Sequence, residues 1–153
     1  MRLNWSATLA EAGPAVRGMG KVAHASTLEP LLLELVNARA SQINGCAHCL
    51  DMHTKDARAM GESEQRLHLL ATWRESPVYS QRERAALAWT EALTLLPETG
   101  APDDVFGEMA EVFTAEEQVA LTMAIATINV YNRLAVGFRS PVGDYVSRRS
   151  PPA

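Results

Sequence analysis

The chain has 153 residues, of which 47% are hydrophobic and 21% are charged, and its formal net charge is −4 with a pI of about 5.6. This length is enough for one domain with a hydrophobic core and short for two. We therefore expect a single domain over residues 1–153, with its core at about residues 14–138 and flexible or clasping ends. The acidic balance argues against nucleic-acid binding, which needs a basic face.

Capping signals and apolar periodicity predict an all-α fold, a compact bundle of six or seven helices. Residues 1–12 are weakly patterned and are expected to form a mobile or partner-clasping arm. The expected helices follow at about residues 14–25, 27–42, 46–60, 64–74, 81–96, 102–112 and 115–138, with a loop at 97–102 and a tail at 140–153. The candidate N-caps are Ser26 or Thr27, Ser63, Ser80 and Thr114, and the last two each open a capping box with a glutamate.

The segment at 27–42 contains one polar residue where a buried helix should be apolar. Glu34 stands alone among leucines and a valine in the run from Leu31 to Val36. A buried carboxylate without a partner is costly or takes up a proton, so Glu34 needs a partner, and a raised pKa would suit it to moving protons. The alternative is a structural salt bridge to an arginine such as Arg39 or Arg133.

The two cysteines of the chain form a Cys-x-x-Cys at the expected start of the next helix. Asn44-Gly45 ends the preceding helix, and Cys46 and Cys49 then lie in the first turn of the new one, where the helix dipole and unpaired N–H groups favour a thiolate. At 100° per residue, Cys46, Cys49 and His53 fall within about 60° of one another. His53 is therefore placed to take the thiol proton or to hold the thiolate by a hydrogen bond.

Three interpretations of this cysteine pair remain open: a redox dithiol, part of a zinc site, or an inert pair. Zinc could use Cys46, Cys49 and His53 with Glu34 or His48, but no second pair of ligands follows along the chain. In a cytosolic chain, two cysteines at this spacing favour redox chemistry. His48 lies about 140–160° from the other three on the helical wheel, so it is a secondary candidate that lines an entrance or a subunit contact.

The helix expected at 115–138 is the longest and is largely apolar, which places it at the centre of the bundle or at a subunit interface. Asn129, Asn132 and Arg133 interrupt it at i, i+3 and i+4. Buried amides need partners, so these residues are expected to bond to other helices or subunits, with a substrate wall as the alternative. The large aromatic residues are expected to pack in the core or an interface: Trp73, Trp89 and Tyr131.

Several motifs are absent from the sequence, and their absence reduces the number of functions to consider. The sequence has no glycine-rich phosphate loop, serine nucleophile elbow or carboxylate dyad, so we expect no cofactor. No apolar stretch is expected to reach the roughly 18 to 20 residues of a membrane span, and the first residues lack the apolar core of a signal peptide. We therefore expect a cytoplasmic protein without a membrane partner.

The spacing Glu-x(11)-Cys-x-His-Cys-x(3)-His resembles the active-site signature of the alkylhydroperoxidase D (AhpD)-like branch of the carboxymuconolactone decarboxylase superfamily. The matching residues are Glu34, Cys46, His48, Cys49 and His53, and a looser likeness extends over most of residues 14–138. The resemblance implies an AhpD-like helical protomer that assembles into trimers or hexamers. It also implies a thiol-dependent peroxidase in which Cys49 attacks the peroxide, Cys46 resolves the sulfenic acid, and a dithiol donor, such as a lipoyl-bearing protein, reduces the disulfide.

The residues themselves do not decide which cysteine attacks the peroxide. Exchange chemistry of the thioredoxin type would make Cys46 the residue that meets the reducing partner. Two other functions also stay open. One is a decarboxylase acting on an aromatic-degradation lactone, as in the other branch of the superfamily. The other is a non-catalytic redox sensor or oligomeric binding module whose disulfide state changes its assembly.

Overall fold

The computed structural model describes residues 1–151, and within this range it contains α-helices and no strand, as predicted. The helices are α1 (Trp5–Thr8), α2 (Ala12–His24), α3 (Pro30–Ile43), α4 (Ala47–Ala59), α5 (Glu64–Leu69), the 3-10 helix η1 (Leu70–Thr72), α6 (Gln81–Thr94), α7 (Leu96–Thr99), α8 (Asp103–Val112) and α9 (Ala115–Phe138). Seven of these α-helices are longer than one turn, in agreement with the predicted six or seven. The single-turn helices α1 and α7 were not predicted, and α7 lies where a loop was expected.

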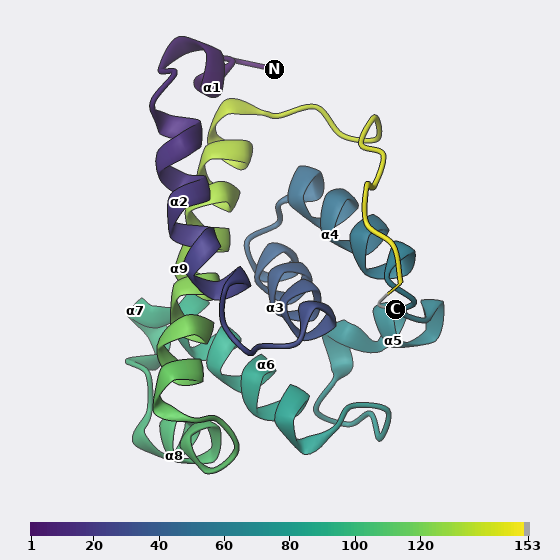
Figure 1. The fold of residues 1–153 in the computed structure, drawn as a ribbon, viewed down its shortest axis with the longest axis vertical. Coiled ribbons are helices and arrows are strands. Elements are labelled where there is room, and N and C mark those ends of the chain that lie inside the picture. Colours follow the sequence, from purple (N-terminus) through teal and green to yellow (C-terminus); the bar gives the residue numbers. More distant parts are fainter. Residues whose placement is uncertain (152–153) are drawn as a thin grey trace.

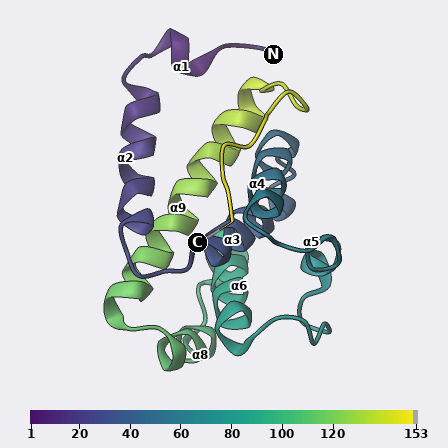
Figure 2. The same cartoon turned by 45° about the vertical axis from the view of Figure 1, so that its right-hand side comes forward.

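Helix α3 forms the centre of the bundle because nearly all of its faces are apolar. Pro30 is its first residue, where a missing N–H costs nothing, and eight of its residues from Leu32 to Ser41 are buried. α3 packs against α4, α6 and α9, while α2 lies along α9 on the outside of the bundle (Figures 1 and 2). The predicted packing of the cysteine helix on the Glu34 helix is confirmed, since α3 and α4 are in extensive contact.

Most helix starts follow the predicted capping signals, with one correction. Ser80 and Thr114 both form complete capping boxes. The prediction that Ser26 or Thr27 caps α3 is wrong, because the helix begins later, after Glu29. The Ser26 hydroxyl instead donates to the Ala23 carbonyl at the end of α2.

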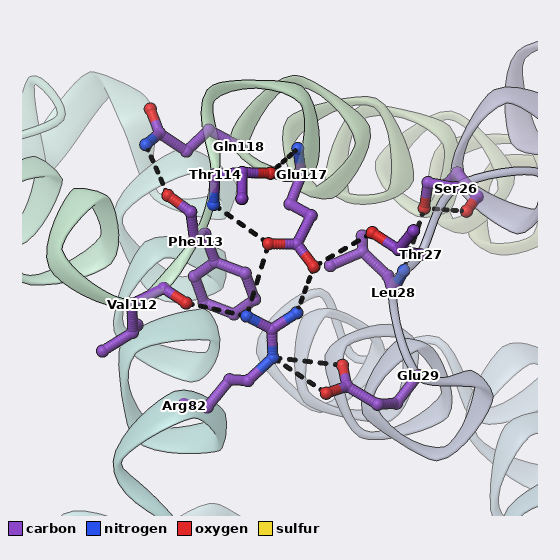
Figure 3. Close-up of polar contacts among 11 residues, drawn as sticks. Ser26, Thr27, Leu28, Glu29, Arg82, Val112, Phe113, Thr114, Glu117 and Gln118 are labelled. Carbon is purple, nitrogen blue, oxygen red and sulfur yellow. Dashed lines mark hydrogen bonds and ion pairs between the residues drawn. The ribbon is translucent and has the colours of Figure 1, made fainter.

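Glu117, in the first turn of α9, is the centre of a polar cluster that joins distant parts of the chain (Figure 3). Its carboxylate accepts a hydrogen bond from Arg82 Nη2 on α6 at 2.6 Å, and another from the Thr27 hydroxyl at 3.1 Å. The Thr114 backbone N–H donates to it at 2.9 Å. The Arg82 guanidinium and then the Thr114 backbone N–H lower the pKa of Glu117 to about 2.

Arg82 extends the same cluster to two more segments (Figure 3). Its Nε donates to Glu29 ahead of α3, and its Nη1 donates to the Val112 carbonyl at the end of α8. The guanidinium also lies 4.1 Å from the ring centroid of Phe113. We call Arg82, Glu117, Glu29 and Thr27 the Arg82 cluster; it ties the ends of α3, α6, α8 and α9 together.

Helix α9 passes, by length and composition alone, the threshold for a membrane-spanning helix, with a mean hydropathy of 1.3 over its most apolar window. This differs from the expectation that no apolar stretch would reach that length. Half of that window is buried inside the protein, and a core helix of a water-soluble protein passes the same test. Its contacts with α2, α3 and α6 are consistent with the predicted central position.

Both ends of the chain contact the helices. The N-terminal arm, expected to be mobile or to clasp a partner, packs on the chain itself: the Arg2 backbone N–H donates to the Phe138 carbonyl at 2.7 Å, and the Trp5 ring lies 6.4 Å from that of Tyr131. The predicted C-terminal tail leaves α9 and runs back along α4 (Figures 1 and 2). Its residues 152 and 153 lie outside the described part.

Candidate functional site

The turn between α3 and α4 determines where both cysteines lie. The Gly45 N–H donates to the Gln42 carbonyl and the Cys46 N–H to the Ser41 carbonyl, which is the pattern of a Schellman C-cap. Gly45 has a φ of +63°, a conformation in which a side chain would be strained. The chain therefore changes direction sharply at Gly45. The Cys46 N–H caps the C-terminus of α3, and the same residue begins α4.

Cys46 is the N-cap of α4, and Cys49 lies in its first turn, as predicted. The Cys46 sulfur accepts a hydrogen bond from the Cys49 N–H at 3.3 Å, which is the role usually filled by a serine or aspartate oxygen. The two residues are disulfide-bonded, with Cα atoms 5.4 Å apart, and each is 1% exposed. They pack against Ala40, Ile128 and Ala135, so the disulfide lies between α3 and α9.

The partner that buried Glu34 requires is His53. His53 Nδ1 lies 2.7 Å from Glu34 Oε2, and the two side chains are 11% and 3% exposed. The two arginines named for the alternative salt bridge bond elsewhere: Arg39 pairs with Glu91, and Arg133 donates to Asn129 on its own helix. The arginine that does lie near Glu34 is Arg149. The Glu34 contact fixes Nδ1, so Nε2 is the ring nitrogen left to exchange a proton with a thiol or a substrate.

His48 lies apart from this pair, as its position on the helical wheel predicts. Its Nδ1 contacts the Pro141 carbonyl at 2.6 Å, which ties the first turn of α4 to the start of the tail. His48 and Cys46 line the same surface cavity of 240 Å³, together with Ala135, Arg139 and Val142. The secondary role predicted for His48, lining an entrance, fits this location.

The amides of α9 support the cysteine turn from behind. Asn44 Nδ2 donates to Oδ1 of both Asn129 and Asn132, at 3.0 and 2.8 Å, and Asn132 Nδ2 donates to the Ser41 hydroxyl at 3.0 Å. Asn129 also donates to Thr94 on α6. The prediction of hydrogen bonds between helices is thus confirmed for Asn129 and Asn132, whereas Arg133 donates to Asn129 on its own helix. The Asn44 and Ser41 bonds hold the residues on both sides of Gly45.

The C-terminal tail contributes side chains to the site that were not predicted from the sequence. Lys55 on α4 donates to the Gly143 and Tyr145 carbonyls, and the Tyr145 hydroxyl donates to Asp56 at 2.9 Å. Burial, followed by the hydrogen bond to Asp56, raises the pKa of Tyr145 to about 12, so this hydroxyl keeps its proton. The tail then brings Arg149 Nη2 to 3.8 Å from Glu34 Oε1.

A cavity of 280 Å³ borders the site on the side of His53 and lies between α2, α3, α4 and α9. Its apolar walls include Leu33, Met52, Ile128 and Tyr131, and Ile128 also packs against the disulfide. The two cavities thus border different parts of the site: Cys46 lines the cavity shared with His48, while His53 lines this larger one. Neither cavity was predicted from the sequence.

Within residues 1–151, no group of three or more histidine, cysteine, aspartate or glutamate side chains is arranged to hold a metal ion. The zinc alternative raised by the sequence thus finds no preformed ligand set in the described part of the chain. The site contains a disulfide-bonded Cys-x-x-Cys pair, a histidine one turn away and a buried carboxylate that orients the histidine. Such groups can carry out thiol chemistry coupled to proton transfer.

Comparison with known proteins finds relatives over most of the chain. The sequence profile of the carboxymuconolactone decarboxylase family matches residues 10–92. The uncharacterized protein YdfG of Bacillus subtilis is 42% identical over 118 residues, which cover 77% of this chain and 80% of YdfG. The uncharacterized protein YnjA of Escherichia coli is 33% identical over 108 residues, which cover 71% of this chain and 59% of YnjA.

Solved structures agree with these matches. A protein of unknown function from Agrobacterium tumefaciens, described as a candidate antioxidant defence protein AhpD, is 47% identical with a TM-score of 0.90 over 94% of this chain and 99% of its own. The debrominase Bmp8 shares the fold at 21% identity, with a TM-score of 0.80 over 90% of this chain and 74% of its own. The chain therefore belongs to the carboxymuconolactone decarboxylase family, and its fold is AhpD-like.

Proposed function

We propose that the protein is a thiol-dependent peroxidase that reduces organic hydroperoxides through Cys46 and Cys49. The observation that carries the proposal is the disulfide at the start of α4 beside the buried Glu34–His53 pair. A structural disulfide would not need a titratable histidine oriented by a carboxylate one turn away. The arrangement suits a thiol peroxidase, because the thiol must lose a proton and the leaving alkoxide must gain one.

In the first step, His53 takes the proton of the Cys49 thiol, and the thiolate attacks the terminal oxygen of the hydroperoxide. The O–O bond breaks, the sulfur is oxidised to a sulfenic acid, and the alkoxide leaves as an alcohol after taking the proton from His53. Glu34 keeps the His53 ring in one orientation through its contact with Nδ1. Arg149 lies 3.8 Å from the other carboxylate oxygen of Glu34.

In the second step, Cys46 attacks the sulfenic acid, the disulfide forms and water leaves. A dithiol donor then reduces the disulfide by exchange and is itself oxidised to a disulfide, so the sum is one hydroperoxide and one dithiol converted to alcohol, water and a disulfide. A lipoyl-bearing protein is one candidate donor. Because the donor must stay reduced, we place the protein in the cytoplasm.

The surroundings of the disulfide support Cys49 as the attacking residue and Cys46 as the residue that meets the donor. Cys49 lies one turn from His53, whereas Cys46 lines the surface cavity with His48. We place the donor at the cavity lined by Cys46 and the hydroperoxide at the cavity lined by His53. Assembly into trimers or hexamers is part of the proposal, and light scattering on the purified protein measures it.

The proposal is tested by intact-protein mass spectrometry of the reduced protein after one equivalent of cumene hydroperoxide. The wild type should lose two hydrogens within seconds. Cys46→Ser should form a sulfenic acid at Cys49 that dimedone traps, whereas Cys49→Ser should form none at a comparable rate. If Cys49→Ser gave the trapped species at the wild-type rate, the assignment of the two cysteines would be reversed.

If the thiols of the wild type reacted no faster than free cysteine, the peroxidase proposal would be wrong. Two measurements would then separate the remaining functions. Turnover of a carboxymuconolactone by a variant lacking both cysteines would favour the decarboxylase. A change of oligomeric state on oxidation without peroxide turnover would favour a redox sensor.

A further inference from the structure

The charged side chains that line the cavity beside His53 are all basic. Arg17 and Lys21 of α2 line it, and no aspartate or glutamate among the described residues does. The whole chain carries 18 acidic and 14 basic residues, so an exclusively basic lining runs against the overall charge. This lining therefore needs an explanation in terms of what the cavity binds.

Arg17 and Lys21 also differ from most other cations of the protein in their surroundings. Six arginines and one lysine each lie within 4.0 Å of a carboxylate: Arg39, Arg58, Arg66, Arg74, Arg82, Arg149 and Lys55. Within residues 1–151, neither Arg17 nor Lys21 has such a partner. Both are exposed, so their charge is available to a ligand that enters from solvent.

The position of these two residues follows from the helical repeat of α2. Arg17, Lys21 and His24 recur at i, i+4 and i+7, which places them on one face of the helix, and all three line the cavity. Partial burial and then the positive charge of Arg149 lower the pKa of His24, so His24 is neutral at neutral pH and offers a hydrogen bond instead of a charge. The cationic edge thus consists of Arg17 and Lys21.

The remaining walls are apolar, and His53 is the one lining residue that belongs to the proposed catalytic pair. At 280 Å³ the cavity lies just below the roughly 300 Å³ at which pockets for drug-sized ligands begin, so it suits a small organic molecule. We propose that its occupant is an organic hydroperoxide that carries a carboxylate: the apolar body lies against α3 and α9, and the carboxylate pairs with Arg17 and Lys21. This substrate class rests on the peroxidase function proposed above.

The kinetic test uses two hydroperoxides that differ only in one carboxylate: cumene hydroperoxide and its 4-carboxy derivative. We expect kcat/KM to favour the acid by about tenfold at low salt, since charge-assisted hydrogen bonds are the stronger ones. Arg17→Gln combined with Lys21→Gln should remove this preference, so that the ratio of the two kcat/KM values falls from about ten to about one. The charge reversal Arg17→Glu should turn the preference toward the neutral compound.

The matched control is Arg58→Gln, which removes one positive charge at an exposed pair with Glu64, away from both cavities. It should retain the preference for the acid. Equal kcat/KM for the two hydroperoxides in the wild type, or a preference for the acid that persists in the double variant, would overturn the proposal. Such results would favour a neutral occupant such as a lipoyl amide.

A binding measurement separates this inference from the peroxidase function. Calorimetry on the oxidised protein, which turns over no peroxide, compares the two product alcohols, 2-phenyl-2-propanol and its 4-carboxy derivative. Tighter binding of the acid that is lost in the double variant supports the site even if peroxidase activity is absent. Equal affinities for the two alcohols would contradict the site even if the protein proved to be a fast peroxidase.

Discussion

The protein contains two buried glutamates in very different surroundings. Glu117 in the Arg82 cluster is 8% exposed and bonds to a permanently charged arginine, a hydroxyl and a backbone N–H. Glu34 is 2% exposed, bonds to a titratable histidine and has an arginine 3.8 Å away on an aperiodic tail. Burial of a carboxylate therefore does not distinguish structure from function, whereas the chemistry of its partner does.

A carboxylate held by arginine and backbone groups stays ionised over a wide pH range and can only stabilise the fold. A carboxylate that orients a histidine acts on a side chain that can exchange protons. Here that histidine lies beside the disulfide and a cavity. Substitutions in the Arg82 cluster should consequently change stability and leave the thiol chemistry intact. Substitutions around Glu34 and His53 should slow the thiol chemistry and lower stability less than those in the Arg82 cluster.

The largest effect is expected at His53. His53→Gln can still donate an amide hydrogen bond to Glu34 but cannot carry the proton, so oxidation of the thiols by cumene hydroperoxide should slow by about 100- to 1,000-fold. Stopped-flow tryptophan fluorescence would follow the reaction. His68→Gln, at a side chain that is 75% exposed on α5, is the control and should react at the wild-type rate. A wild-type rate of thiol oxidation in His53→Gln would show that His53 takes no part in the reaction.

Glu117→Gln should be the strongest perturbation of stability. It removes the charge that Arg82 and Thr27 contact, and we expect the free energy of unfolding to fall by about 2–3 kcal/mol. Urea titration followed by circular dichroism measures this change. Glu116→Gln, at the neighbouring exposed residue, should change stability by less than about 0.5 kcal/mol. Slower thiol oxidation in Glu117→Gln would contradict the separation of the two regions.

The pH dependence of stability provides a third comparison. Glu117 has a pKa of about 2 in the folded protein and an ordinary value of 4.5, so its contribution is complete above the unfolded value and is lost as the pH falls from 4.5 toward 2. The difference in unfolding free energy between the wild type and Glu117→Gln should therefore shrink over this range. Urea titrations at pH 6, 4 and 3 test it, and a constant difference would show that Glu117 does not titrate as described.

The smallest effect is expected at Arg149, which is 46% exposed and acts through a screened contact of 3.8 Å. Arg149→Gln should slow thiol oxidation by about two- to fivefold, mainly at low salt, with unfolding unchanged within about 0.5 kcal/mol. Arg148→Gln, at the preceding residue, serves as the control. Equal rates of thiol oxidation in Arg149→Gln and Arg148→Gln would mean that the Arg149 contact with Glu34 does not affect the reaction.

The central features could be predicted because each has a local signal in the sequence. Gly45 marks the reversal, the Cys-x-x-Cys spacing places the thiols in one turn, and Glu34 stands out in an apolar run. The i, i+4, i+7 spacing of Arg17, Lys21 and His24 was equally visible, but a basic helix face is usually only solvated. Its meaning depends on the cavity that packing of α2 against α9 creates.

The role of the tail could not have been predicted in the same way. Residues 140–151 form no helix, so no periodicity indicates which side chains face inward. Tyr145 and Arg149 find Asp56 and Glu34 only because the chain turns back along α4, over a sequence separation of 89 residues for the Tyr145–Asp56 bond. The surroundings of Glu34 could be predicted only in part: it was expected to relay protons with His53 or to pair with an arginine, and the structure has both the His53 contact and Arg149 from the tail.

The most direct test of the account is a parallel measurement on Glu34→Gln and Glu117→Gln. For each variant, the rate of disulfide formation with one equivalent of cumene hydroperoxide and the free energy of unfolding are determined on the same preparation. The amide introduced by Glu34→Gln could still accept the His53 N–H but would lack the charge, so we predict a rate at least about tenfold lower in this variant, with a smaller loss of stability than in Glu117→Gln. A wild-type rate in Glu34→Gln, with a stability loss as large as that of Glu117→Gln, would show that both carboxylates are structural and would contradict the account.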